Sequence, residues 1–178
     1  MGNFGSAIPL DDNHKSLIIQ AISDGNKKEV LDFMAEYDLE TYNGIHFLKW
    51  DFANTNLLRN LSDDRFQCLK IKRGPWKLVL VYDKETKYLY SLMNKHRFLQ
   101  LQERVNKEQV HYIDALALIN KGLRGNGKNK QLRLFIVKSD KTNTKNLLKE
   151  ILQQIDGEVI RFTVIAFSNE KDEITSVS

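Results

Sequence analysis

The run from Trp76 to Tyr82 constrains the fold most, because all but one of its seven residues are apolar. Its β-branched and aromatic side chains favour a central strand. Gly74-Pro75 breaks the chain before this run, Asp83-Lys-Glu-Thr86 is typical of a hairpin connection, and Lys87 to Met93 is the returning strand. Phe66 to Lys72 alternates as well. The sequence therefore predicts a β-meander of three strands.

Helical periodicity precedes this meander. It predicts one helix over about 14–23 and a second, over 26–37, with an apolar stripe. Asp24-Gly25-Asn26 turns the chain between them, so we expect an αα-hairpin. A DNA-reading helix-turn-helix uses the same elements, but the second helix would then turn acidic side chains toward phosphate. These residues, Glu29, Asp32, Glu36 and Asp38, favour a packing hairpin.

The stretch between the hairpin and the meander predicts a further strand. Ile45 to Phe52 alternates and is rich in aromatic residues, which is the pattern of extended structure. Leu57, Leu58 and Leu61 then indicate a short helical turn.

The second half of the chain mixes both periodicities. The pattern predicts helical structure from Lys95 to about Gly122 and then a strand from Leu132 to Val137. An apolar stripe from Leu147 to Ile155 predicts a further helix, and alternation predicts a last strand from Val159 to Phe167. A strand, a helix and a strand with short connections form a βαβ unit, which leaves the two strands parallel.

A chain of 178 residues is expected to form a single domain, here residues 1–178. The predicted fold class is α+β, with an N-terminal αα-hairpin packed on a mixed β-sheet that combines the β-meander and the C-terminal βαβ unit. We expect residues 1–10 and 169–178 to be a flexible leader and tail.

The net charge of +4 conceals a strong asymmetry along the chain. Residues 1–64 carry a net charge of −6, residues 65–149 carry 20 basic and 6 acidic side chains for a net charge of +14, and residues 150–178 carry −4. Such an asymmetry indicates an anionic partner for one face of the protein.

Two clusters concentrate this basic charge. One surrounds the turn at Gly74, beside Trp76, with Tyr88 and Tyr90 on the following hairpin as candidate stacking rings. The other lies in the loop after Gly122, which has the Gly-x4-Gly-Lys spacing of a phosphate-binding loop but lacks the following Ser or Thr and the strand-then-helix context. The candidate nucleic-acid-binding residues are Lys70, Lys72, Arg73, Lys77, Lys121, Arg124, Lys128, Lys130 and Arg133.

Catalytic patterns are sparse. The four histidines are scattered and show no zinc-binding spacing, and Cys68 has no neighbour that would activate its thiol. We therefore expect no catalytic residue, no metal site and no cofactor. Asp83, Glu85 and Lys87 resemble the Asp and Glu-x-Lys set of the PD-(D/E)xK nucleases, but they fall in or beside one turn, whereas that family places them on neighbouring strands.

Two regions of the sequence resemble a family of small bacterial or phage proteins with no assigned function. They are His46-Phe-Leu-Lys-Trp-Asp-Phe52 with Asn56-Leu-Leu58, and Arg73-Gly-Pro-Trp-Lys-Leu-Val-Leu-Val-Tyr-Asp83 with Leu89-Tyr-Ser-Leu-Met93. The likeness covers about residues 45–121. It implies a bacterial or phage source and carries over no catalytic residue.

The basic central segment leads to the functional prediction. We expect a non-enzymatic protein that contacts the phosphate backbone of nucleic acid, with a role in regulation or in conflict between phage and host. Two alternatives stay open: a protein-interaction module, an inhibitor or adaptor, with an acidic partner protein, and a PD-(D/E)xK-like metal-dependent nuclease. A lone Cys68 and the absence of a membrane-spanning apolar stretch favour the cytoplasm and no membrane partner.

Overall fold

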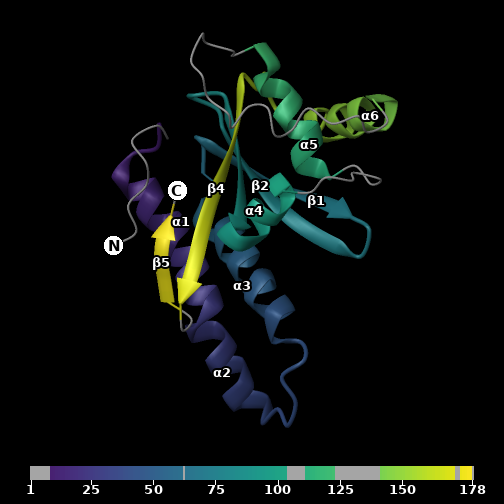
Figure 1. The fold of residues 1–178 in the computed structure, drawn as a ribbon. Helices are drawn as coiled ribbons and strands as arrows, with labels where there is room; N and C mark the ends of the chain where they lie inside the picture. Colours follow the sequence, from purple (N-terminus) through teal and green to yellow (C-terminus); the bar gives the residue numbers. More distant parts are fainter. Residues whose placement is uncertain (1–8, 62, 104–110, 123–140, 171–172, 178) are drawn as a thin grey trace.

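The computed structural model describes residues 9–61, 63–103, 111–122, 141–170 and 173–177. Helices lead into a sheet with further helices inserted before its last two strands (Figure 1). In chain order the elements are α1 (Asp12–Asn26), α2 (Lys28–Tyr37), α3 (Ile45–Asn60), β1 (Phe66–Arg73), β2 (Trp76–Asp83), β3 (Tyr88–Asn94), α4 (Lys95–Glu103), α5 (Tyr112–Leu116), the 3-10 helix η1 (Ala117–Gly122), α6 (Lys141–Leu152), β4 (Arg161–Glu170) and β5 (Glu173–Val177).

The sheet has the strand order β1-β2-β3-β4-β5. The first three strands form the expected antiparallel meander, with Lys72 opposite Lys77 in β1–β2 and Leu80 opposite Ser91 in β2–β3. β4 runs parallel to β3, and β5 pairs antiparallel with β4. The predicted α+β class with a mixed sheet is confirmed. The predicted strand at 132–137 lies outside the described residues, and the parallel pair within them is β3–β4.

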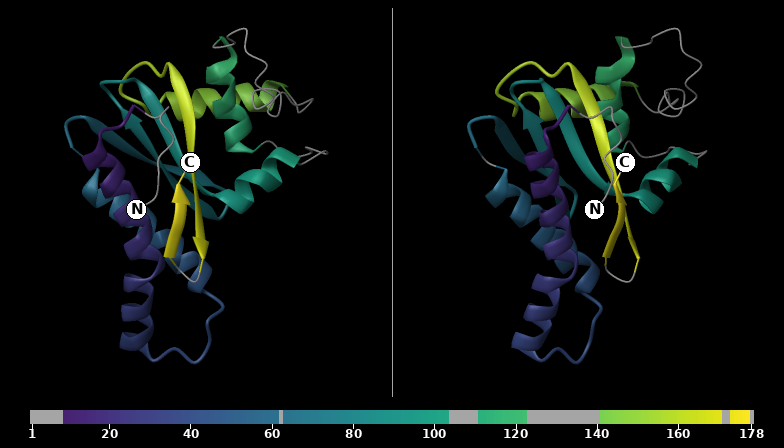
Figure 2. Two further views of the ribbon diagram at one scale, coloured as in Figure 1. Left: turned by 60° about the vertical axis from the view of Figure 1, so that its left-hand side comes forward. Right: turned by 90° about the vertical axis from the view of Figure 1, so that its left-hand side faces the viewer.

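Helices cover both faces of the sheet (Figure 2). Alternate side chains along the strands enter two apolar clusters, as the two-residue period of a strand requires. The cluster under α1 and α3 contains Ile18, Ile22, Leu57, Val79, Val81, Leu92 and Ile165. The cluster under α4, α5 and α6 contains Leu80, Leu89, Met93, Leu101, Ile113, Leu116 and Ile151.

The expected αα-hairpin of the first two helices is wrong, because α1 continues through the predicted turn at Asp24-Gly25-Asn26. The two helices that pack against each other and on the sheet are α1 and α3. α1 begins at the N-cap Asp11, whose carboxylate accepts a hydrogen bond from the backbone N–H of His14 at 2.9 Å. Lys27 alone separates α1 from α2, and the two helices follow one another along one line (Figures 1 and 2). Gly25 allows α3 to approach, because a Cβ there would lie 2.5 Å from the backbone nitrogen of Ala53.

The expected strand over Ile45 to Phe52 is wrong, because this stretch is the first half of α3. A helical period also fits the segment: Ala53, Asn56 and Leu57 are its buried positions, and they pack toward α1. Tertiary packing against a neighbouring helix outweighs the strand preference of the aromatic residues.

The expected flexibility of residues 169–178 is also wrong for most of that stretch. β4 extends to Glu170, and Glu173–Val177 form β5, which pairs with it from Phe167 onward. Backbone hydrogen bonds at a sheet edge hold this polar segment although it has few apolar side chains. At the other end, Leu10 of the predicted leader is buried, and residues 1–8 lie outside the described part. Within the described ranges, no helix combines the length and the apolar character needed to cross a bilayer.

The sheet divides at one place. β1 and β2 pair along their whole length, and so do β3 and the first part of β4, but β2 and β3 pair only between residues 80–83 and 88–91. Residues 76–79 of β2 and 92–94 of β3 therefore separate, and we call this opening the fork.

Candidate functional site

A pocket of about 440 Å³ lies in the fork, and we call it the fork pocket. This is within the size range of sites that hold small ligands. Both separated strand segments line it, together with side chains from helices on both faces of the sheet. The lining residues are Phe47, Trp50, Asp51 and Asn54 of α3, Pro75 of the turn, Trp76, Lys77, Leu78 and Val79 of β2, Leu92, Met93 and Asn94 of β3, Arg97 of α4 and Tyr112 of α5.

Three aromatic rings of the pocket are exposed. The exposed fractions of Phe47, Trp50 and Trp76 are 50%, 37% and 53%. The Phe47 and Trp76 rings lie 4.7 Å apart between centroids, which joins the start of α3 to the β1–β2 hairpin. Grouped exposed apolar rings beside a pocket are typical of a binding surface rather than of a core.

Three lysines lie on one face of the β1–β2 hairpin next to this pocket. Lys72 is directly opposite Lys77, and Lys70 is two residues along the same strand, so all three side chains point to the face that α3 covers. All three are exposed, and none forms an ion pair with another described residue. Like charges directly opposite each other destabilise a sheet, so this arrangement favours an external anion.

The other side of the pocket is polar. Tyr112 is buried, its hydroxyl lies 3.0 Å from the Ser91 hydroxyl, and burial raises the pKa of its phenol. Arg97 lines the pocket from α4, with its Nη1 donating to Gln100 at 3.3 Å. The fork pocket thus has three rings, Lys77 and the carboxylate of Asp51 on one side, and the guanidinium of Arg97 on the other.

The structure brings together only part of the predicted basic set. Lys70, Lys72, Arg73 and Lys77 share the β1–β2 hairpin, as expected from the sequence. Arg124, Lys128, Lys130 and Arg133 lie outside the described residues.

Lys121 lies at the opposite end of the sheet from the hairpin lysines. Its neighbour Asn120 exchanges hydrogen bonds of 2.7 and 2.9 Å with the backbone of Phe162. Phe162 is beside Leu89, which is beside Tyr82. Tyr82 is five residues from Lys77, or roughly 16 Å along the strand at about 3.3 Å per residue. Lys121 therefore belongs to a different surface.

The expectation that Tyr88 and Tyr90 offer stacking rings is wrong for Tyr90. Tyr90 is fully buried in the cluster under α1 and α3, and burial raises the pKa of its phenol. The Tyr88 ring packs 6.2 Å from the Tyr90 ring and lies under the guanidinium of Arg161 at 5.4 Å. Tyr88 is the first residue of β3, at the end of the strand away from the fork.

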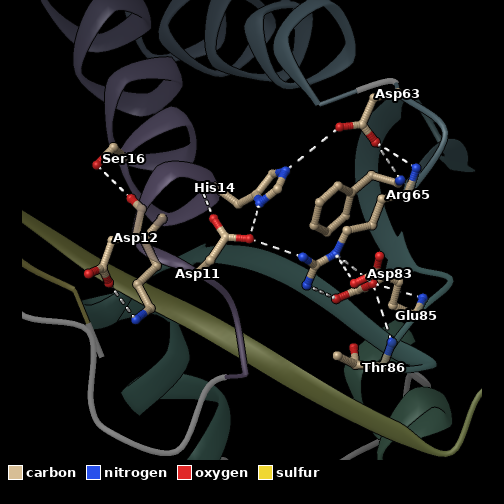
Figure 3. A network of polar contacts seen from close by, with 11 residues as sticks. Asp11, Asp12, His14, Ser16, Asp63, Arg65, Asp83, Glu85 and Thr86 are labelled. Atoms are coloured by element: carbon tan, nitrogen blue, oxygen red, sulfur yellow. Dashed lines mark hydrogen bonds and ion pairs between the residues drawn. The ribbon is translucent and has the colours of Figure 1, made fainter.

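A network of charged side chains occupies the end of the sheet opposite the fork (Figure 3). The Nε and Nη2 of Arg65 donate to the two oxygens of Asp83 at 3.1 and 2.8 Å, and its Nη1 donates to Asp11 at 3.0 Å. Glu85 lies 3.3 Å from the same guanidinium. His14 lies between Asp11 and Asp63. This network, the Arg65 network, neutralises a fully buried carboxylate.

The environment of each group explains its pKa. Burial by itself raises the pKa of the Asp83 carboxyl, but hydrogen bonds from Arg65 and Thr86 outweigh it and the net pKa is lowered. The backbone hydrogen bond from His14, with the His14 side chain, lowers the pKa of Asp11 to about 2. The hydrogen bond to Asp83 raises the pKa of the Arg65 guanidinium.

The nuclease-like set does not converge in this structure. Asp83 is directed to Arg65, Glu85 faces the same guanidinium, and Lys87 pairs with Glu158 at 3.5 Å. Across the described parts of the chain, no group of three His, Cys, Asp or Glu side chains is arranged to hold a metal ion.

Sequence comparison adds the family. A family model matches residues 7–178 of the chain. The chain belongs to DUF5986, a family of unknown function. The expected membership of a family without assigned function is confirmed, over a longer range than the predicted 45–121. No curated protein and no solved structure shows significant similarity to the chain.

Sequence reasoning missed the residues that α3, α4 and α5 contribute to the fork pocket. Phe47, Trp50 and Asp51 were assigned to a strand, and Arg97 and Tyr112 carried no motif. The only sequence signal among these residues is the pair of aromatic side chains Phe47 and Trp50, which lie exposed on α3.

Proposed function

We propose that this DUF5986 chain binds single-stranded nucleic acid without a catalytic step. Phosphates contact Lys70, Lys72 and Lys77 on the β1–β2 hairpin, and an unpaired base enters the fork pocket against Phe47 and Trp76. Positively charged surfaces with adjacent aromatic rings hold single strands in this way.

The observation that carries the proposal is the arrangement of the hairpin lysines. Three exposed lysines share one face, two of them directly opposite each other, and no described acidic side chain neutralises them. Exposed aromatic rings adjoin them through Lys77, which lines the same pocket as Trp76 and Phe47. A phosphate backbone supplies the missing negative charge, and a base supplies a flat apolar partner.

A single strand fits the pocket better than a duplex does. Bases of a duplex are stacked and paired, so their faces are not available to Trp76 or Phe47. Lysine binds phosphate as a point charge, and it predominates here over arginine, so we expect little sequence specificity and a strong dependence on salt.

Two optical signals test the proposal. Anisotropy of labelled single- and double-stranded DNA and RNA, titrated between about 50 and 200 mM salt, measures affinity and the salt slope. The two tryptophans of the chain, Trp50 and Trp76, both line the fork pocket, so quenching of their emission reports a base entering it. No binding at low salt would overturn the proposal. A duplex preferred over the single strand would contradict the role of the rings.

Trp76→Ala should weaken single-strand binding by roughly 5- to 150-fold, which corresponds to about 1–3 kcal/mol for one stacked base. The ring is 53% exposed, so the free energy of unfolding should change little. The affinities of Trp76→Ala and the parent chain are compared by anisotropy, with urea unfolding as the control for stability. An unchanged affinity would contradict the proposal that a base stacks on Trp76 in the fork pocket.

The lysines are tested as a pair with a matched control. Lys72→Glu with Lys77→Glu should lower the affinity for all sequences and reduce the salt slope by about 1.4, at about 0.7 per phosphate contact on single strands. Lys145→Glu with Lys149→Glu makes the same change of net charge on exposed positions of α6. If both double variants lose the same affinity, total charge rather than the hairpin surface attracts nucleic acid.

A further inference from the structure

The segment from Glu29 to Tyr42, which we call the arm, extends beyond the sheet (Figures 1 and 2). It consists of most of α2 and the first part of the connection to α3. Val30 is the only buried residue of α2, and α2 contacts chiefly α1 and α3. A helix with so little buried surface has faces that no other described element covers.

The arm exposes apolar side chains. The exposed fractions of Leu31, Tyr37 and Tyr42 are 55%, 59% and 56%. These three and the three rings of the fork pocket make up most of the large apolar side chains that the described residues expose. Exposed apolar groups are concentrated at two places, as expected if each is an interaction surface.

The arm is also strongly acidic. Residues 29–42 contain five acidic side chains and no lysine or arginine. Glu29 accepts a hydrogen bond of 2.6 Å from the buried side chain of Asn56. The remaining four form no ion pair with other described residues. They are Asp32, Glu36, Asp38 and Glu40.

The complement of this surface is present on the same chain. The β1–β2 hairpin carries three exposed lysines beside an exposed tryptophan, so it offers cations and an apolar ring to an acidic, apolar helix. None of the ion pairs between described residues joins the arm to the hairpin within one molecule. We propose that the arm of one copy binds the β1–β2 hairpin of a second copy.

Charge complementarity supports this occupant over an unrelated partner. The fold places the acidic arm and the hairpin lysines on two projecting elements, and none of the ion pairs between described residues joins the two. Opposite potentials on two surfaces steer association and fix its register. Because the hairpin lysines take part, binding of a second copy and binding of nucleic acid exclude each other. Self-association itself requires no nucleic acid, so each proposal fails or succeeds alone.

Light scattering coupled to size exclusion tests self-association with the nucleic-acid-free chain. At low ionic strength the mass should rise with protein concentration, and the apparent dissociation constant should increase at least roughly 10-fold at about 0.5 M salt. A mass that stays monomeric at low ionic strength and high protein concentration would overturn the proposal.

Charge exchange identifies the two surfaces. Asp32→Lys with Glu36→Lys reverses the charge of the arm at two exposed positions one helical turn apart. Lys72→Glu with Lys77→Glu reverses the charge of the β1–β2 hairpin surface. Each double variant alone should be monomeric, and an equimolar mixture should associate again, because the reversed arm then meets the reversed hairpin. Lys145→Glu with Lys149→Glu should associate like the parent chain.

Two outcomes of the exchange would contradict the assignment. Association that persists in either reversed variant would place the contact elsewhere, and a mixture that stays monomeric would show that the two surfaces do not meet. Leu31→Ser, an exposed apolar change in the arm, should weaken association without altering charge. Circular dichroism of each variant verifies that its helices remain folded.

Discussion

The two ends of the β1–β2 hairpin differ in whether their charged side chains are paired. Where β1 begins and β2 ends, Arg65 bridges Asp11 and Asp83, and Asp83 is fully buried. At the turn between the strands, Lys72 lies opposite Lys77, both are exposed, and no described acidic side chain pairs with them. The same two strands therefore hold a neutralised cluster at one end and an uncompensated one at the other.

This difference separates structural charge from charge available to a partner. A buried carboxylate without its guanidinium is strongly unfavourable, so the Arg65 network stabilises the fold. The exposed lysines make no such contribution and cost stability through their mutual repulsion. The net charge of +4 does not distinguish paired from unpaired charges, because that difference depends on where each side chain lies in the sheet.

The largest effect is expected in the Arg65 network. Arg65→Met leaves the buried Asp83 carboxylate without its counter-charge, which should lower the free energy of unfolding by about 3–5 kcal/mol. Urea denaturation measures the change. Arg59→Met, at an exposed position of α3, is the matched control and should stay within about 0.5 kcal/mol of the parent chain. Equal stabilities of the two variants would contradict the structural role of Arg65.

A smaller effect is expected at Asp11, which caps α1 and contacts Arg65. Asp11→Ala should cost about 0.5–2 kcal/mol through the lost N-cap. The pKa of Asp11 is lowered to about 2 from 3.8, so its carboxylate stabilises the fold above about pH 4 and loses that contribution as the pH falls toward 2. Unfolding followed between pH 5 and 2 should show a shallower loss for Asp11→Ala. Parallel curves for the two proteins would contradict the assignment.

The smallest effect, and the most diagnostic, is expected at the turn. Lys77→Glu converts a pair of like charges across the strands into a pair of opposite charges. It should raise the free energy of unfolding by a few tenths of a kcal/mol, while weakening single-strand binding. Thermal unfolding and anisotropy on the same sample measure the two changes. A loss of stability would mean that Lys77 already has a favourable partner in the folded chain.

The sequence contains most of the information on the fold. The meander from Phe66 to Met93 is predictable because period-two alternation and turn residues agree there. The strand prediction for Ile45 to Phe52 is wrong because Phe47 and Trp50 lie exposed on α3, at positions where a helical pattern would have polar residues. The rings that line the fork pocket are thus the ones that give the segment its strand-like alternation. Such local conflicts are expected at functional positions.

The site is less predictable than the fold. Lys70, Lys72 and Lys77 are close in sequence, so a single turn brings them together. Arg97 and Tyr112 join Lys77 in the fork pocket only because β2 and β3 stop pairing at Leu80 and Ser91. Nothing in the continuous apolar run of β2 marks that position, so the fork arises from tertiary structure alone.

The parallel pairing of β3 with β4 has a consequence for the order of folding. Tyr88 is beside Arg161, so this pair closes a long segment of chain, whereas the meander closes only short turns. The entropy of loop closure makes distant pairings slow relative to local ones. On the ribosome, the strand that completes the sheet beside β3 emerges after several helices have been synthesised. The meander with its lysine-bearing turn is therefore expected to form first, and β4 to join it in a later, rate-limiting step.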